Sequence, residues 1–218
     1  MTKPPYRVVA WGDSIAAGNA DTAWPGVAER SCQVVINTGR PVQVINEAVC
    51  GKPAAHAVRE FEARILPHRP DLVIIQFGFN DVRHDGSRGP DPLSTPEEFE
   101  QHLASMIRQC RGQAQADVIV LGNHRTRTNI RFPTGRTYEE SRILYNAIAR
   151  RTAAQAGVEF HDMSDPAHLP DATGWQELVV PDGVHLSPLG VTVYGRAIAT
   201  WIMQHVTTSV PRPAEGDV

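Results

Sequence analysis

Residues 71–77 constrain the fold more than any other stretch of this sequence. They read Asp-Leu-Val-Ile-Ile-Gln-Phe, and positions 72–75 are apolar without a break. A strand with one solvated face alternates apolar and polar residues, whereas a strand covered on both faces reads as a continuous apolar run. We therefore expect a central strand that lies between two layers of helices.

Other apolar runs alternate with segments of helical character along the chain. The expected strands lie at 6–11, 42–45, 71–77, 118–121 and 158–160, and the expected helices at 25–36, 53–66, 96–109, 138–156 and 188–205. Thr95 and Glu98 have the spacing of a capping box, and Gly157 suits a helix C-cap. Strands that alternate with helices predict an α/β fold, with a parallel sheet and helices on both faces.

The length and the net charge of the chain limit the number of domains and the kinds of partner that we expect. A chain of 218 residues suits one α/β domain, which we place at 1–206, followed by a flexible polar tail at 207–218. The formal net charge of −3 argues against nucleic acid or an anionic membrane as the main partner. No apolar run is long enough to span a bilayer, so membrane insertion is not expected.

The cysteines and the first residues bear on the cellular compartment. The three cysteines, Cys32, Cys50 and Cys110, are odd in number and contain no closely spaced pair, which argues against a disulfide scaffold or a zinc site. The first seven residues contain no apolar signal core. These features favour a cytoplasmic protein, although a chain whose signal peptide had been removed would read the same way.

Polar or permissive residues follow three of the expected strands. Ser14 follows the first strand, Gly51 the second and Asn80 the third. In open α/β sheets the site lies at the carboxyl ends of the strands, so these residues are expected on one edge. A serine there could act as a nucleophile if a base takes its proton. The alternative is that Asp13 and Ser14 form a turn or cap a helix that begins near Ile15.

His185 is the best placed of the nine histidines to act as that base. Asp182 precedes it by three residues in an expected turn, from which a carboxylate can reach Nδ1–H and leave Nε2 to face Ser14. The alternative is an Asp–His pair that only braces a loop. His124 ends a strand near the same edge and is a candidate for substrate contact.

An acyl-transfer reaction also needs donors for the oxyanion. The candidates are the backbone N–H groups of Ser14 and Gly51 and the side-chain amide of Asn80. Gly51 and Asn80 could each be ordinary turn residues instead. Their shared position at strand ends favours the functional interpretation.

Four motifs resemble those of the SGNH hydrolases, also called the GDSL esterase/lipase family. They are Gly12-Asp13-Ser14-Ile15, Asn46-Glu47-Ala48-Val49-Cys50-Gly51, Gly78-Phe79-Asn80-Asp81 and Asp182-Gly183-Val184-His185, with Cys50 where the family often has serine. The resemblance covers about residues 7–190. It implies a flavodoxin-like three-layer α/β/α sandwich with a five-stranded parallel sheet. It also implies Ser14 as nucleophile, His185 as base, Asp182 as its partner, and Ser14, Gly51 and Asn80 as oxyanion donors.

These observations predict a serine ester hydrolase that forms an acyl-enzyme on a small-molecule acyl ester, without a metal or organic cofactor. An acyltransferase, a lysophospholipase or an acyl thioesterase could use the same residues. A non-catalytic binding module is disfavoured, because Ser14, His185 and Asp182 are all present. The sequence gives no basis for an oligomeric state.

The loop at 122–137 bears on the substrate. It carries four arginines, among them Arg125 and Arg127, which favour a polar or anionic substrate and are candidates to bind it. The alternative is that these arginines are solvated or pair with Glu139 and Glu140. We expect short-chain deacylation, with carbohydrate O-deacetylation as one form of it.

Overall fold

The computed structural model describes residues 4–18, 23–34, 40–168 and 174–208. Five parallel strands form one sheet in the order β2-β1-β3-β4-β5. The strands are β1 (Tyr6–Gly12), β2 (Val42–Asn46), β3 (Leu72–Gln76), β4 (Asp117–Gly122) and β5 (Glu159–Asp162). This order is the flavodoxin-like doubly wound arrangement, in which the chain reverses direction across the sheet between β1 and β3.

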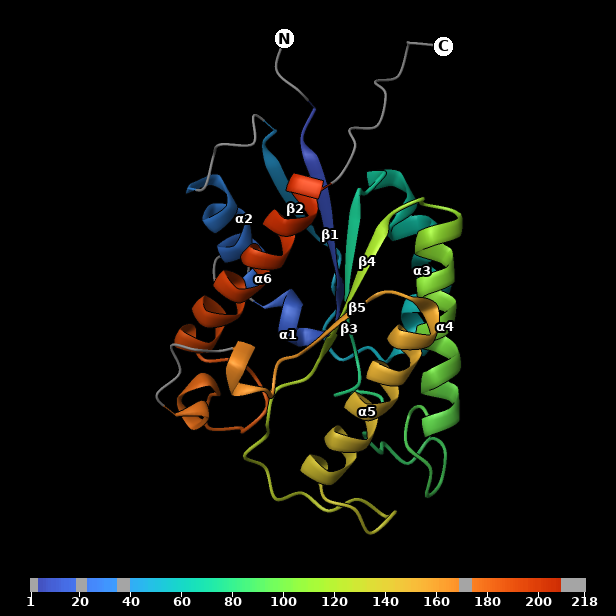
Figure 1. The fold of residues 1–218 in the computed structure, drawn as a ribbon. Helices are drawn as coiled ribbons and strands as arrows, with labels where there is room; N and C mark the ends of the chain where they lie inside the picture. The colour runs from blue at the N-terminus through green and yellow to red at the C-terminus, as the bar shows by residue number, and fades with distance from the viewer. Residues whose placement is uncertain (1–3, 19–22, 35–39, 169–173, 209–218) are drawn as a thin grey trace.

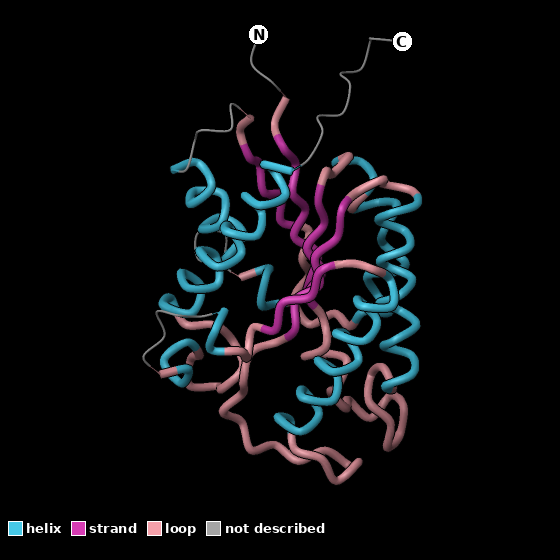
Figure 2. Tube along the Cα trace, in the orientation of Figure 1, coloured by secondary structure: helices cyan, strands magenta, loops and turns pink. Residues whose placement is uncertain are grey.

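Helices cover both faces of the sheet. They are α1 (Ser14–Ala17), α2 (Trp24–Val34), α3 (Ala54–Arg64), α4 (Pro96–Gly112), α5 (Tyr138–Ala156) and α6 (Pro188–Thr208), with short 3-10 helices η1 (Leu66–His68), η2 (Pro166–His168) and η3 (Trp175–Leu178). Figure 1 shows α2 and α6 on one face and α3, α4 and α5 on the other. Figure 2 shows the strands as the middle layer. The predicted three-layer α/β/α fold is confirmed.

Local sequence signals fix the ends of the long helices. The Thr95 side chain caps α4 and forms the predicted capping box with Glu98. Thr137 and Glu140 form a second capping box at the start of α5. Gly157 ends α5 in the left-handed conformation, with a φ of 64°. Each motif satisfies backbone groups that a helix end leaves unpaired, so these boundaries agree with the sequence.

Several boundaries differ from the expected ones. The helix expected at 53–66 ends at Arg64 and continues as η1, and β5 begins at Glu159 rather than at 158. The helix α6 runs to Thr208, so positions 207 and 208, expected in the flexible tail, are helical. The remaining part of that tail, 209–218, lies outside the described residues, as do positions 35 and 36 of the helix expected at 25–36.

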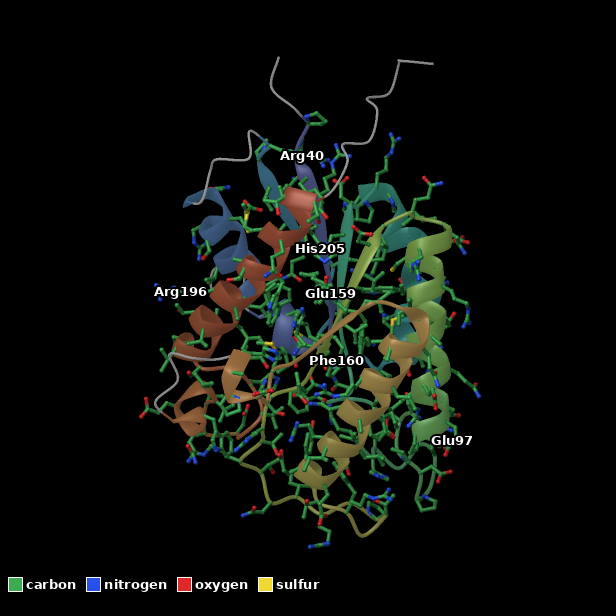
Figure 3. All side chains as sticks on the ribbon, viewed as in Figure 1. Arg40, Glu97, Glu159, Phe160, Arg196 and His205 are labelled. Atoms are coloured by element: carbon green, nitrogen blue, oxygen red, sulfur yellow. The ribbon has the colours of Figure 1, made fainter. Side chains whose placement is uncertain are left out.

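The two ends of the sheet carry different kinds of side chains, and its buried strands lie between them. Every residue of β3 is buried, as the apolar run predicted. Arg40 and Asp71 form an ion pair of 3.0 Å at the amino ends of the strands, and Figure 3 places Arg40 at that end. At the edge strand β5, Glu159 Oε1 lies 3.1 Å from Nε2 of His205, which comes from α6 (Figure 3). The carboxyl ends of the strands, at the opposite end from Arg40, carry the predicted site residues.

In the part of the chain that the structure describes, no helix combines the length and apolar character needed to cross a membrane.

Candidate active site

Ser14 lies where β1 passes directly into α1. Gly12 makes this junction possible, because a Cβ there would stand 2.8 Å from the carbonyl oxygen of Gln76 on the adjacent strand. The Asp13 side chain caps α1 by accepting a hydrogen bond from Ile15 N–H at 3.0 Å. The helix-cap alternative is therefore correct for Asp13, and it leaves the Ser14 hydroxyl free for another partner.

That partner is His185, 171 positions further along the chain. His185 Nε2 lies 2.9 Å from Ser14 Oγ, and His185 Nδ1 lies 2.7 Å from Asp182 Oδ2. A carboxylate only accepts hydrogen bonds, so Nδ1 carries the proton and the lone pair of Nε2 faces the serine hydroxyl. This geometry suits proton transfer from Ser14 to His185.

Asp182 also holds the turn on which His185 sits. Its Oδ1 accepts hydrogen bonds from Val184 N–H at 2.8 Å and from His185 N–H at 2.9 Å. Partial burial alone would raise the pKa of the Asp182 carboxyl, but the hydrogen bonds from Val184 and His185 outweigh it and hold that pKa below its ordinary value. Asp182 is thus ionised at neutral pH and can both orient the imidazole and stabilise its protonated form.

Asn80 reaches the same place from the loop after β3. Its Nδ2 donates to Asp13 Oδ2 at 3.2 Å, so the amide lies beside the residue that precedes Ser14. Asp81 is buried and accepts hydrogen bonds from the N–H groups of Ala54 and Gly78 and from the Ser94 hydroxyl. Asp81 therefore braces the loop that carries Asn80.

Gly51 belongs to a turn tied to the end of β1. Val49 N–H donates to the carbonyl oxygen of Gly12 at 2.9 Å, and Gly51 follows two residues later with a φ of 73°. Within the described ranges, neither Ser14 N–H nor Gly51 N–H donates a hydrogen bond to another protein group. Two backbone donors at this edge are thus open to a ligand.

Two buried carboxyl groups lie beneath this edge. Burial raises the pKa of Asp13 to about 7 and the pKa of Asp81 to about 6. Asp13 is the more affected of the two, although it accepts hydrogen bonds from Ile15 and Asn80 and is attracted by His185. Its charge state therefore changes near neutral pH.

The structure corrects the interpretation of His124. Its side chain is buried, with Nδ1 2.5 Å from the Tyr194 hydroxyl and Nε2 2.7 Å from the carbonyl oxygen of Val184. Both ring nitrogens are bonded within the protein and are not open to a substrate. The sequence placed His124 at the correct edge, but the packing of α6 turns its ring inward.

Arg125 and Arg127 are both exposed on the loop after β4. Arg127 N–H donates to the carbonyl oxygen of Gly183 at 2.8 Å, which places this loop against the turn that carries His185. Neither arginine forms an ion pair with Glu139 or Glu140, so for these two the solvated alternative holds, whereas hydrogen bonds from Thr137 and the charges of Arg131 and Arg136 lower the pKa of Glu140. Glu139 binds Arg142 and Thr126, and Glu140 completes the cap with Thr137.

The sequence did not point to two residues that contact predicted site residues, Arg83 beside Asn80 and Tyr194 beside His124. Arg83 donates from Nη1 to Asn80 Oδ1 at 3.1 Å. A signal for it existed, since a side chain three residues after Asn80 in the same loop can fold back onto it. Tyr194 gave no such signal, because its contact with His124 depends on how α6 docks against the sheet.

Among the described residues, no group of three or more His, Cys, Asp or Glu side chains is arranged to hold a metal ion.

Comparison with known proteins agrees with this architecture. The chain is 27% identical to Esterase TesA of Pseudomonas aeruginosa over 180 residues. This aligned region covers 80% of this chain and 76% of that protein. It superposes on a lipase/acylhydrolase from Enterococcus faecalis with a TM-score of 0.74, at 23% identity over 95% of this chain and 99% of the other. It superposes on a variant of an acetylxylan esterase from Geobacillus stearothermophilus with a TM-score of 0.73, at 18% identity over 98% of this chain and 100% of the other.

The profile of one family spans nearly the whole described sheet and its helices. It is the GDSL-like Lipase/Acylhydrolase family, and it matches residues 10–193. That range includes all four motifs from Ser14 to His185. The chain therefore belongs to the GDSL-like lipase/acylhydrolase family of ester hydrolases.

Proposed function

We propose that the protein hydrolyses small acyl esters, with Ser14 as nucleophile, His185 as general base and Asp182 as the residue that orients His185. The observation that carries the proposal is the continuous hydrogen-bonded series from Ser14 Oγ through the imidazole to Asp182 Oδ2, at 2.9 and 2.7 Å. A nucleophile bonded to a base, and a base bonded to a third group, is the arrangement that activates a serine.

The reaction proceeds in two acyl-transfer steps. In the first, Ser14 Oγ bonds to the carbonyl carbon as His185 Nε2 takes the hydroxyl proton, and His185 then gives this proton to the departing alcohol. In the second, water attacks the acyl-enzyme, again losing a proton to His185, and the acid leaves as Ser14 regains its proton. The Ser14 and Gly51 N–H groups and the Asn80 amide donate to the oxyanion in both steps.

The substrate we propose carries a short acyl group on a polar alcohol. The loop at 122–137 presents exposed Arg125 and Arg127 beside the His185 turn, a surface better suited to a polar or anionic group than to a long alkyl chain. The likeness in fold to an acetylxylan esterase also supports deacetylation of a carbohydrate.

Ser14→Ala tests the proposed nucleophile. The variant should lose essentially all hydrolysis of p-nitrophenyl acetate, whereas Ser87→Ala, at an exposed serine of the loop after β3, should retain it. A fluorophosphonate reagent should form a bond from Ser14 Oγ to its phosphorus as fluoride leaves, so the peptide that contains Ser14 should gain the mass of the reagent less HF in the wild type only. Full activity in Ser14→Ala would overturn the assignment.

A series of p-nitrophenyl esters tests the acyl chain length. We expect kcat/KM to be highest for acetate or butyrate and to fall for octanoate. A maximum at octanoate or a longer ester would contradict the short-chain proposal and favour a lipid substrate.

A further inference from the structure

The Asn80 amide is held from two sides by groups of opposite hydrogen-bonding character. Arg83 Nη1 donates to Asn80 Oδ1 at 3.1 Å, and Asn80 Nδ2 donates to Asp13 Oδ2 at 3.2 Å. A side-chain amide has two N–H hydrogens, so one Nδ2 hydrogen remains after the bond to Asp13. That remaining hydrogen is the one available to an oxyanion.

The orientation of this amide decides whether it helps or opposes the reaction. Rotation by half a turn exchanges Oδ1 and Nδ2, and an oxygen in place of the N–H group would repel the developing oxyanion. A guanidinium donates hydrogen bonds and cannot accept them, so it can face only Oδ1. We propose that Arg83 is a positioning residue that locks the Asn80 amide with Nδ2 toward the acyl oxygen. This inference rests on the proposed function, since it requires Asn80 to be an oxyanion donor.

Asp13 cannot fix the orientation alone at every pH. Burial raises its pKa to about 7, with the nearby charges of Asp81 and His185 acting in opposite directions. An ionised Asp13 only accepts and therefore faces Nδ2, whereas a protonated Asp13 can also donate to Oδ1. Arginine keeps its proton throughout, so Arg83 selects the same orientation in both states of Asp13.

The backbone around Arg83 keeps its side chain in reach of Asn80. Arg83 N–H donates to the carbonyl oxygen of Asn80 at 3.0 Å, and Leu93 N–H donates to that of Arg83 at 2.8 Å. In the described part of the chain, no carboxylate forms an ion pair with Arg83. The nearby Asp85 instead binds Ser87. The charge of Arg83 acts on Asp85 only from beyond ion-pair distance, and the hydrogen bond that the guanidinium makes is the one to Asn80.

Kinetics of three variants on p-nitrophenyl acetate test the proposal. Arg83→Met keeps the length of the side chain but has no donor, and we expect kcat to fall about tenfold with KM nearly unchanged. Arg83→Lys keeps a side chain that donates hydrogen bonds and cannot accept them, so it should retain most of the wild-type kcat. Arg108→Met removes an exposed arginine from α4, outside the loops that carry Asn80 and Arg127, and should have wild-type kcat. A neutral substrate is used so that loss of charge does not itself weaken binding.

A double-mutant cycle with Asn80→Ala gives the decisive result. If Arg83 acts through Asn80, Arg83→Met should cost nothing further in the Asn80→Ala background. An equal loss in both backgrounds, or a kcat of Arg83→Met within about twofold of the wild type, would overturn the proposal. Thermal unfolding of each variant shows whether it is folded. Activity in Ser14→Ala would instead refute the proposed function itself, so the two failures are distinguishable.

A pH series adds a measurement that a merely structural role would not change. Without Arg83, only Asp13 selects the amide orientation, and protonated Asp13 does not select it. The ratio of Arg83→Met to wild-type kcat should therefore fall as the pH is lowered through about 7. A ratio that stays constant with pH would contradict the role assigned to Arg83. The ratio cancels any pH dependence that the two enzymes share.

Discussion

His124 Nε2 lies 2.7 Å from the carbonyl oxygen of Val184, the residue immediately before His185. A carbonyl only accepts, so Nε2 carries the hydrogen, and Nδ1 must accept from the Tyr194 hydroxyl at 2.5 Å. Burial lowers the pKa of His124 to about 4, so the ring stays neutral as this tautomer requires. The end of β4 and the helix α6 together hold the backbone beside the proposed base.

Removal of the Tyr194 hydroxyl should loosen this support. In Tyr194→Phe the buried Nδ1 of His124 has no donor, and an unsatisfied buried polar atom costs about 1–3 kcal/mol. We expect the free energy of unfolding in urea to fall by that amount and kcat to fall with it. Thr200→Ala, on the exposed side of the same helix, is the control and should change neither. An unchanged unfolding free energy in Tyr194→Phe would show that this hydrogen bond contributes little.

The neutral state of His124 also predicts a dependence of stability on pH. Burial lowers its pKa from 6.5 to about 4, so as the pH falls the unfolded chain takes up a proton before the native protein does. The stability that neutral His124 provides is therefore present above about pH 6.5 and lost as the pH falls toward about 4, a change of about 3 kcal/mol.

Comparison with His124→Gln isolates this effect from that of the other buried groups. The variant should be less stable than the wild type at neutral pH, and the difference should shrink as the pH is lowered through the window between the two pKa values. Urea unfolding across that range measures it. A difference that does not change with pH would mean that His124 is not held neutral in the native protein.

Asp182→Asn should separate the two roles of this carboxylate. The amide oxygen of asparagine can still accept from Val184 N–H and His185 N–H, so the turn should persist. The charge that stabilises a protonated His185 is lost, and kcat should fall by about 10²–10⁴-fold. Kinetics on p-nitrophenyl acetate, with circular dichroism to check the fold, test this. A loss below about tenfold would indicate that Asp182 mainly braces the turn.

The sequence predicted those parts of the fold that depend on local signals. The apolar run at 72–75, the capping box of Thr95 and Glu98 and the C-cap at Gly157 each act within a few residues, and each is found in the structure. The meeting of Ser14 with His185 could also be predicted, although they are far apart in sequence. Parallel strands bring their carboxyl ends to one edge, and His185 lies between β5 and α6, so the alternation of strands and helices places both residues there.

Side-chain direction could not be predicted in the same way. Whether His124 faces a substrate or the protein interior depends on Tyr194, which lies on α6, 70 positions later in the chain. The orientation of the Asn80 amide likewise depends on Asp13, which follows another strand, and on the path of the loop through Arg83. Such contacts follow from tertiary packing, which residue patterns do not encode.

Gly183 is the residue whose replacement should most directly displace the proposed base. It has a φ of 78°, and a Cβ there would lie 2.8 Å from Thr128 N and 3.0 Å from Arg127 Cβ. In Gly183→Ala the turn must move away from the loop at 122–137 and carry His185 from Ser14. We expect a loss of more than about 2 kcal/mol in unfolding free energy and a large fall in kcat.

Gly135→Ala is a matched control for this effect. Gly135 has a φ of 80°, but nothing lies within 4 Å of the Cβ that alanine would add. It should therefore pay only the backbone cost of about 1–2 kcal/mol for a left-handed alanine and keep wild-type kcat. The difference between Gly183→Ala and Gly135→Ala measures the close approach of the turn to Arg127 and Thr128. Equal kcat in the two variants would show that this contact does not position His185, and the support from His124 and Asp182 would then be sufficient.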